Sequence, residues 1–157
     1  MHINLTQKER LLLEDQRKHE EMCIEKYTSY ASHAQDPQLQ QLFREYAAQE
    51  KRHLDSINQL LSGKIPQMQQ QGQTQTAPPQ PQDRSMPGFG QGQASDAALC
   101  QDLLMTEKYV SSTYDTAIFE FTDPQARQVL NHIQKEEQQH GEGIFHYMQS
   151  RGMYKPQ

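Results

Sequence analysis

The chain has 157 residues, enough for one domain with a single hydrophobic core. Its net charge of -5 at pH 7 excludes the basic surface of a nucleic-acid-binding protein. The sequence contains no run of about 18 apolar residues, so no membrane span is predicted. Its two cysteines, Cys23 and Cys100, form no C-x-x-C pair, which excludes a rubredoxin-type iron site and fits synthesis in a reducing cytoplasm.

A first helix is expected over residues 7–34. Thr6 and Glu9 have the spacing of a capping box, which marks its start. Spacing by threes and fours then predicts one inward-facing stripe. The stripe consists of Leu13, Glu20, Ile24, Tyr27, Ala31 and Ala34. Asp36 and Pro37 end this helix and start another, because Asp is a good N-cap and Pro fits the first helical turn.

The second helix is expected over residues 37–62, and a crossover over 64–94 follows it. The inward stripe of the helix is Leu39, Phe43, Tyr46, Glu50, His53, Ile57 and Leu60. The crossover is rich in Gln, Pro and Gly and has no apolar period, which predicts a flexible segment. About 30 extended residues at about 3.1 Å each exceed the roughly 42 Å length of such a helix, so the crossover can return along the whole bundle.

Two further helices are expected, over residues 95–121 and 124–151. The third starts at Ser95 or Asp96, and Gly152 is the expected C-cap of the fourth. The inward stripe of the third is Leu103, Glu107, Val110, Tyr114, Ala117 and Phe121. The inward stripe of the fourth is Ala126, Leu130, Ile133, Glu137, His140, Ile144 and Tyr147.

The two halves of the chain align without a gap when one is shifted by 87 positions, the separation of Glu50 and Glu137. The shift also superimposes the Asp-Pro turns, two lone glutamates, two tyrosines and two Glu-x-x-His motifs. A repeated helix pair with these features is typical of a ferritin-like four-helix bundle. We therefore predict a single all-α, ferritin-like domain over residues 1–157, with hairpins 7–62 and 95–151 joined by a long crossover.

Six ionisable residues on the inward stripes predict a metal site. In each Glu-x-x-His both side chains share a helix face, and the lone glutamates lie at a similar distance, about 20 Å, from the turns. Four buried carboxylates would repel one another unless cations were present. The predicted ligands are Glu20, Glu50, His53, Glu107, Glu137 and His140, a set that suits di-nuclear iron or manganese. A metal-free Glu–His layer that fixes the register of the bundle is the alternative.

The remaining tyrosines, aspartates and histidines of interest lie outside the six predicted ligands. Tyr27 and Tyr114 lie one heptad from the lone glutamates, where they could donate a hydrogen bond to a metal-bridging group, carry an electron, or serve as core residues with a polar tip. Asp15 and Asp102 also repeat but lie off the stripe, so we expect them on the surface. Histidines without a repeat partner are expected on the surface too. These are His19, His33, His132 and His146.

Several stretches of the chain resemble the spore coat protein F (Coat F) family. They are LTQKE (5–9), the region of Tyr27, DPQLQQLF (36–43), QEKRHL (49–54) and HYMQSRGMY (146–154). The resemblance spans both helix pairs and implies a ferritin-like domain that a spore-forming bacterium makes in its cytoplasm and deposits in the spore coat. The chain is also similar to ferritin, bacterioferritin and rubrerythrin di-iron proteins, which implies the same six ligands, although it lacks the cysteine motif of a complete rubrerythrin.

Two functions follow as hypotheses. The first is a structural or metal-binding component of the spore coat, with other coat proteins and a second copy of the chain as partners, and with no nucleic acid or membrane span. The second is a di-iron or di-manganese oxidoreductase acting on peroxide, oxygen or ferrous iron, which predicts a solvent path to the layer. A ferritin-like storage shell ranks below both, because the crossover would obstruct close packing of subunits.

Overall fold

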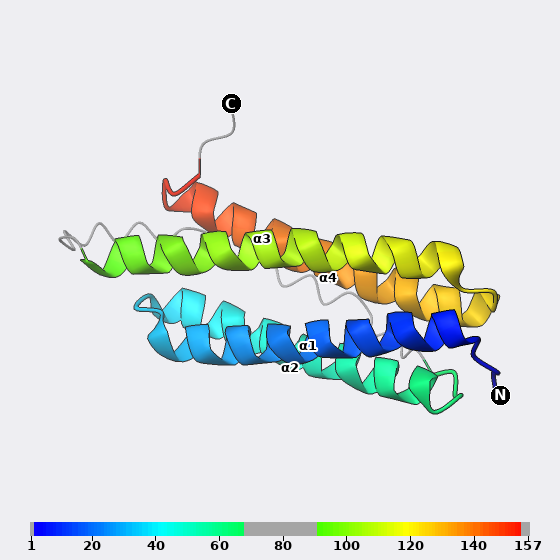
Figure 1. Ribbon diagram of the computed structural model, residues 1–157. Coiled ribbons are helices and arrows are strands. Elements are labelled where there is room, and N and C mark those ends of the chain that lie inside the picture. The colour runs from blue at the N-terminus through cyan, green and yellow to red at the C-terminus, as the bar shows by residue number, and fades with distance from the viewer. Residues whose placement is uncertain (1, 68–90, 155–157) are drawn as a thin grey trace.

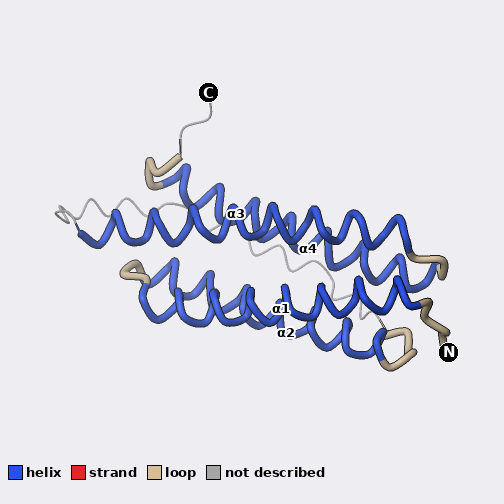
Figure 2. The backbone as a smooth tube through the Cα atoms, in the orientation of Figure 1, coloured by secondary structure: helices blue, strands red, loops and turns tan. Residues whose placement is uncertain are grey.

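The computed structural model describes residues 2–67 and 91–154, with side chains from Asp96 onward in the second stretch. Within these ranges the chain forms four α-helices and no strand: α1 (Gln7–His33), α2 (Pro37–Leu61), α3 (Gln91–Glu120) and α4 (Pro124–Ser150) (Figure 1 and Figure 2). The predicted all-α class is confirmed, whereas most of the predicted crossover, residues 68–90, lies outside the described residues. None of the described helices is apolar over enough of its length to cross a membrane.

The helix ends follow the signals in the sequence. Glu9 N donates to Thr6 Oγ1 (3.1 Å) and Thr6 N donates to Glu9 Oε2 (2.7 Å), so the expected capping box is present. Asp36 and Asp123 cap α2 and α4, each directly before a proline in the first turn. Gly152 has a positive φ of 70° just beyond α4, the conformation expected of a glycine that ends a helix.

The helices are arranged as two antiparallel pairs. α1 packs along α2 and α3 along α4, while α1 faces α3 and α2 faces α4 across the bundle (Figure 1). α2 ends at one end of the bundle and α3 begins at the other (Figure 1). This placement of the two helix ends is the one that a long crossover between the pairs requires.

The third helix carries the predicted stripe and starts earlier than predicted. Its six stripe residues are all buried: Leu103, Glu107, Val110, Tyr114, Ala117 and Phe121. The helix begins at Gln91 rather than at Ser95 or Asp96. Residues 91–95 contain no proline and a single glycine, so nothing in the sequence prevents the helix from extending back to Gln91.

In the other three helices one predicted stripe residue is displaced by its neighbour. Ile24, Tyr46 and Tyr147 are only partly buried. The residues at the adjacent positions, Cys23, Ala47 and Met148, are buried. Neighbouring positions differ by about 100° around a helix, so an unbranched or smaller side chain can take the inward direction while a tyrosine keeps its hydroxyl at the edge of the core.

Two acidic residues fasten the pairs to one another. Thr122 N and Oγ1 both donate to Glu9 Oε1 at 2.9 Å, which ties the start of α1 to the α3–α4 turn. Gln35 N and Asp36 N donate to the two oxygens of Asp96 at 2.9 and 3.1 Å, which ties α3 to the α1–α2 turn. Glu9 and Asp96 are equivalent under the repeat. Both are buried, so these contacts fix how far one pair can slide along the other.

Candidate metal centre

Six ionisable side chains form a buried layer inside the bundle. α1 and α3 each contribute one glutamate, and α2 and α4 each contribute a glutamate and a histidine three residues apart on one helix face. Each residue is at most 2% exposed to solvent. They are Glu20, Glu50, His53, Glu107, Glu137 and His140. The structure thus brings together all six residues that the sequence singled out, and their role as metal ligands stays a prediction.

The layer consists of two overlapping groups of donor atoms. In one group, Glu20 and His53 lie with Glu50 and Glu137; in the other, Glu107 and His140 lie with the same two glutamates. Within each group the donor atoms all lie within 4.8 Å of one another. Either group could hold a metal ion, and Glu50 and Glu137 are common to both.

Both histidines direct Nδ1 into the layer. His53 Nδ1 lies 2.8 Å from Glu137 Oε1 and 3.1 Å from Glu50 Oε2. His140 Nδ1 lies 2.9 Å from Glu50 Oε1 and 3.4 Å from Glu107 Oε1. Each imidazole therefore contacts a carboxylate of the facing helix, and the two rings stack with centroids 5.9 Å apart.

The outer ring nitrogens meet two residues that the sequence analysis missed. His140 Nε2 contacts Gln49 Oε1, and His53 Nε2 lies 3.6 Å from Glu136 Oε1, a distance too long for a hydrogen bond. Glu136 Oε1 also lies 2.6 Å from Nε2 of His132, which lies on the surface as expected. Gln49 and Glu136 are equivalent under the repeat and directly precede the two Glu-x-x-His motifs, the one signal that could have identified them.

The two tyrosines join the helix pairs through the outer glutamates. Tyr27 OH donates to Glu107 Oε1 and Tyr114 OH donates to Glu20 Oε1, each at 2.5 Å. Both tyrosines are fully buried. Burial and the negative charge of the neighbouring glutamates raise the pKa of each tyrosine well above its usual value, so each retains its proton as a hydrogen-bond donor.

The four carboxylates divide into two kinds. Burial and the charges of the other glutamates raise the pKa values of Glu50 and Glu137 well above their usual range. Burial acts the same way on Glu20 and Glu107, but contacts with a neighbouring carboxyl group, a histidine and a tyrosine outweigh it and lower their pKa values. In the metal-free layer these shifts favour the protonated form of the two shared carboxyl groups, Glu50 and Glu137, and the ionised form of Glu20 and Glu107.

Hydrogen bonds within the protein leave part of the layer unsatisfied. Among the described side chains, Glu20 Oε2, Glu107 Oε2, Glu137 Oε2 and His53 Nε2 are buried without a hydrogen-bond partner. Buried polar atoms nearly always have a partner, and exceptions point to a bound water or ion. Three unpartnered carboxylate oxygens in one layer could serve as ligands to a metal ion.

The repeated aspartates stay outside the layer, as expected. Asp15 is exposed. Asp102 is partly buried and accepts from Lys26 Nζ at 2.9 Å and from Tyr30 OH at 2.8 Å. These contacts link α1 and α3, so Asp102 serves the packing of the bundle.

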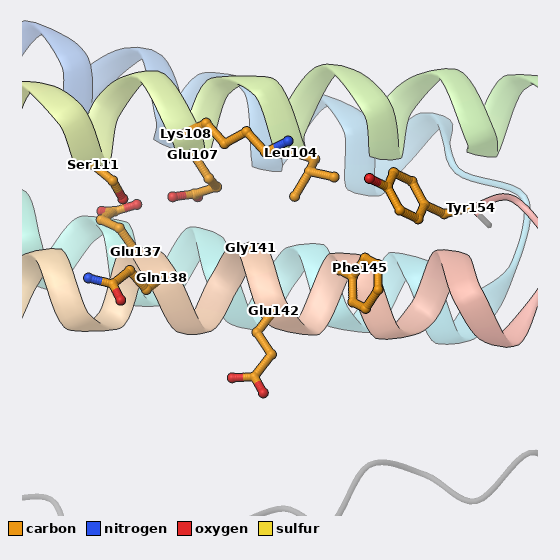
Figure 3. Close-up of a pocket in the computed structure, with 10 residues that line it drawn as sticks. All are labelled: Leu104, Glu107, Lys108, Ser111, Glu137, Gln138, Gly141, Glu142, Phe145 and Tyr154. Carbon is orange, nitrogen blue, oxygen red and sulfur yellow. The ribbon is translucent and has the colours of Figure 1, made fainter. Parts of the chain in front are cut away.

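A groove between α3 and α4 reaches the layer from the surface. Its volume is about 610 Å³, and Glu107 and Glu137 form part of its lining. In Figure 3 these glutamates lie at one end of the groove and Phe145 and Tyr154 lie at the other, with Gly141 between them. The groove therefore approaches the layer along the second helix pair, where Glu107 and Glu137 form its buried end.

The fold and the layer together define a class: an all-α four-helix bundle with a buried cluster of carboxylates and imidazoles that could hold a metal ion. Residues 95–157 match the family model of the Coat F domain. The matched region contains most of α3, all of α4 and the predicted HYMQSRGMY stretch, so the resemblance to the Coat F family is supported for the second helix pair. No curated protein matches the chain. A Coat F domain indicates a spore coat protein, in agreement with the expected localisation.

Proposed function

We propose that the chain is a metal-binding component of the spore coat, with a ferritin-like bundle that holds two iron or manganese ions. The observation that carries this proposal is the pair of overlapping donor groups that share Glu50 and Glu137. Two adjacent sites that share two carboxylates are the arrangement found in carboxylate-bridged di-metal proteins. The metal-free Glu–His layer is the alternative that the experiment below distinguishes.

The residues of the layer suit these ions chemically. Carboxylate oxygen and imidazole nitrogen are the donors preferred by iron and manganese. Two cations would favour the ionised form of Glu50 and Glu137, whose pKa values burial raises, and would satisfy the unpartnered oxygens of Glu20, Glu107 and Glu137. When bound, such ions supply Lewis-acid and one-electron redox chemistry.

Each residue has a distinct task in this proposal. Glu50 and Glu137, which belong to both donor groups, would contribute ligands to both metal positions. Glu20 and His53 would complete one position, and the second would be completed by the equivalent pair on α3 and α4. Tyr27 and its repeat partner hold the outer glutamates in place by hydrogen bonds across the bundle. Contacts between helices from both pairs would then pass through the metal ions, which suits a structural protein that must resist unfolding.

A second candidate function is a di-iron or di-manganese oxidoreductase that acts on peroxide, oxygen or ferrous iron. The observation that favours it is the groove between α3 and α4, because a purely structural metal site needs no opening to solvent. The metal-loaded protein should then consume peroxide, and the groove variant Gly141→Leu should slow that reaction. If the metal-loaded protein does not react with peroxide, oxygen or ferrous iron, the enzymatic function is refuted and the structural function is favoured.

The partners proposed for the coat protein are other spore coat proteins and a second copy of the chain. Chemical cross-linking within isolated coats, compared with size-exclusion chromatography of the purified protein, would identify which contacts form. A protein that stays monomeric and cross-links to no coat component would contradict this part of the proposal.

Elemental mass spectrometry of the purified protein tests the metal site directly. We expect about two iron or manganese ions per chain, and loss of both in a Glu50→Ala/Glu137→Ala variant. Asp15→Ala, which removes an exposed carboxylate from α1, is the matched control and should keep the full metal content. A native protein that stays metal-free after refolding with iron or manganese, and still unfolds cooperatively, would refute the di-metal site and favour the metal-free layer.

A further inference from the structure

The six residues of the layer repeat between the two helix pairs, whereas the groove lies beside the second pair, α3 and α4. Gly141, which lines it, is equivalent to Leu54 under the repeat, and Ser111, also in its lining, is equivalent to Ile24. Leu54 and Ile24 carry bulky, partly buried side chains on α2 and α1. The second helix pair thus has its smallest residues where the first pair has large apolar ones, and this difference opens the layer toward α3 and α4.

Gly141 lies in the lining of the groove, where a side chain could be added without a clash. A Cβ atom added there would lie 3.9 Å from Leu104 Cδ1 and 4.0 Å from Glu107 Cβ, which are ordinary packing distances. A methyl group would therefore fit, and a leucine side chain at this position would extend into the groove between the aromatic end and the carboxylates. The backbone does not demand glycine here, since the residue lies within α4 and only Gly63 and Gly152 have a positive φ in the described residues.

The lining changes in character along the groove. Figure 3 shows Glu107, Glu137 and Ser111 grouped at one end and the rings of Phe145 and Tyr154 at the other. The two rings meet edge to face with centroids 5.1 Å apart. Leu104 lies between the two ends (Figure 3). The remaining lining residues, Lys108, Gln138 and Glu142, are polar. A pocket that combines an apolar wall with a few polar groups is typical of a site for a small organic molecule.

We propose that the groove binds a phenol, with its ring against Leu104, Phe145 and Tyr154 and its hydroxyl directed to Glu107. An uncharged aromatic ring suits the apolar walls. The carboxylate end suits a hydrogen-bond donor, because Glu107 Oε2 is a buried acceptor without a partner among the described residues. This proposal goes beyond metal binding and applies to the metal-free protein.

The test compares p-cresol with 4-methylanisole, in which a methyl group replaces the hydroxyl hydrogen that p-cresol would donate to the carboxylate. Both are titrated into the metal-free full-length protein and followed by ligand-observed NMR. We expect p-cresol to bind about tenfold to a hundredfold more tightly, the range for a hydrogen bond to a charged group. Equal affinities for the two probes, or no binding of p-cresol at millimolar concentration, would overturn the proposal.

Two variants locate the site. Gly141→Leu gives the second helix pair the residue that the first pair carries, and should reduce p-cresol binding at least tenfold. Leu54→Ala changes the equivalent position of the first pair and should leave binding unchanged. If Gly141→Leu does not melt cooperatively, Ser111→Ile fills the same groove from α3 and should have the same effect. Undiminished binding in a folded groove variant would refute the location, whereas a failure of the metal analysis alone would leave this result untouched.

Discussion

Two glycines in the fourth helix provide a matched test of packing beside the buried layer. Gly141 and Gly143 both lie inside α4, so replacing either by alanine gains the same contribution from helix propensity, about 1 kcal/mol. A Cβ at Gly141 meets only ordinary contacts. A Cβ at Gly143 would overlap Tyr46 Oη and lie 3.1 Å from Tyr46 Cζ, so the tyrosine ring would have to move.

Moving Tyr46 disturbs the site as well as the packing. Its ring stacks on that of His140 with centroids 4.2 Å apart and meets the ring of Tyr27 edge to face at 5.7 Å. Overpacking of this kind costs about 1–3 kcal/mol. We expect the free energy of unfolding of Gly141→Ala to exceed that of the wild type by about 1 kcal/mol. That of Gly143→Ala should lie about 1–3 kcal/mol below Gly141→Ala, because the helix contribution cancels between the two variants.

Urea unfolding of the metal-free variants, followed by far-UV circular dichroism, measures these differences. The double variant Tyr46→Phe/Gly143→Ala removes the hydroxyl oxygen that the new methyl group would strike, and should recover most of the loss. Equal stabilities of Gly141→Ala and Gly143→Ala would refute the packing described here. A double variant as unstable as Gly143→Ala would show that the strain lies elsewhere than at Tyr46.

Three further predictions concern the layer itself. Tyr27→Phe removes a hydrogen bond to a buried, ionised carboxylate and should lower the free energy of unfolding by about 1.5–3 kcal/mol; the exposed Tyr109→Phe is the control, and equal small losses would contradict the interpretation. Burial raises the pKa values of Glu50 and Glu137 above those of the unfolded chain, so their contribution to stability is complete below their ordinary value of 4.5 and is lost as pH rises through the raised values. Urea unfolding of the metal-free protein should therefore show falling stability toward alkaline pH and a flatter profile for Glu50→Gln/Glu137→Gln, and a stability that rises with pH would disprove this. Finally, a carboxylate beside a ligating histidine raises metal affinity. Glu136→Gln should therefore weaken binding of one of two manganese ions about tenfold, and Gln49→Glu should strengthen binding of the other. Manganese titration followed by electron paramagnetic resonance measures both affinities, and identical affinities in the wild type and the two variants would contradict this prediction.

The positions of the six site residues were predictable because they depend on quantities that a sequence contains. A helix turns by about 100° and rises by about 1.5 Å per residue, so Glu50 and His53 must share a face and Glu20 must lie at nearly the same height. The repeat supplied the rest, since any geometry adopted by one pair is available to the other. The capped turns at Asp36 and Asp123 fixed the heights, and both caps are present.

Contacts between helices were less accessible from the sequence. Whether Cys23 or Ile24 faces inward depends on a rotation of one position, which the packing of the facing helix decides. The roles of Gln49 and Glu136 depend on the length and direction of side chains that leave the stripe and reach a histidine of another helix. The groove lies where Gly141 has no side chain. A search for periodic apolar residues detects the side chains that are present and so could not predict this groove.

Glu9 and Asp96 each accept hydrogen bonds from the turn of the opposite helical hairpin. The bundle therefore resembles a dimer of two hairpins that are covalently linked. The contacts that neutralise or satisfy the buried glutamates come largely from the opposite hairpin, so a single hairpin would expose a face carrying two unsatisfied carboxylates and an imidazole. Covalent linkage turns the association of the halves into an intramolecular step with a high effective concentration. Folding of the linked chain should therefore be independent of protein concentration, whereas the same two hairpins made as separate polypeptides should come apart on dilution.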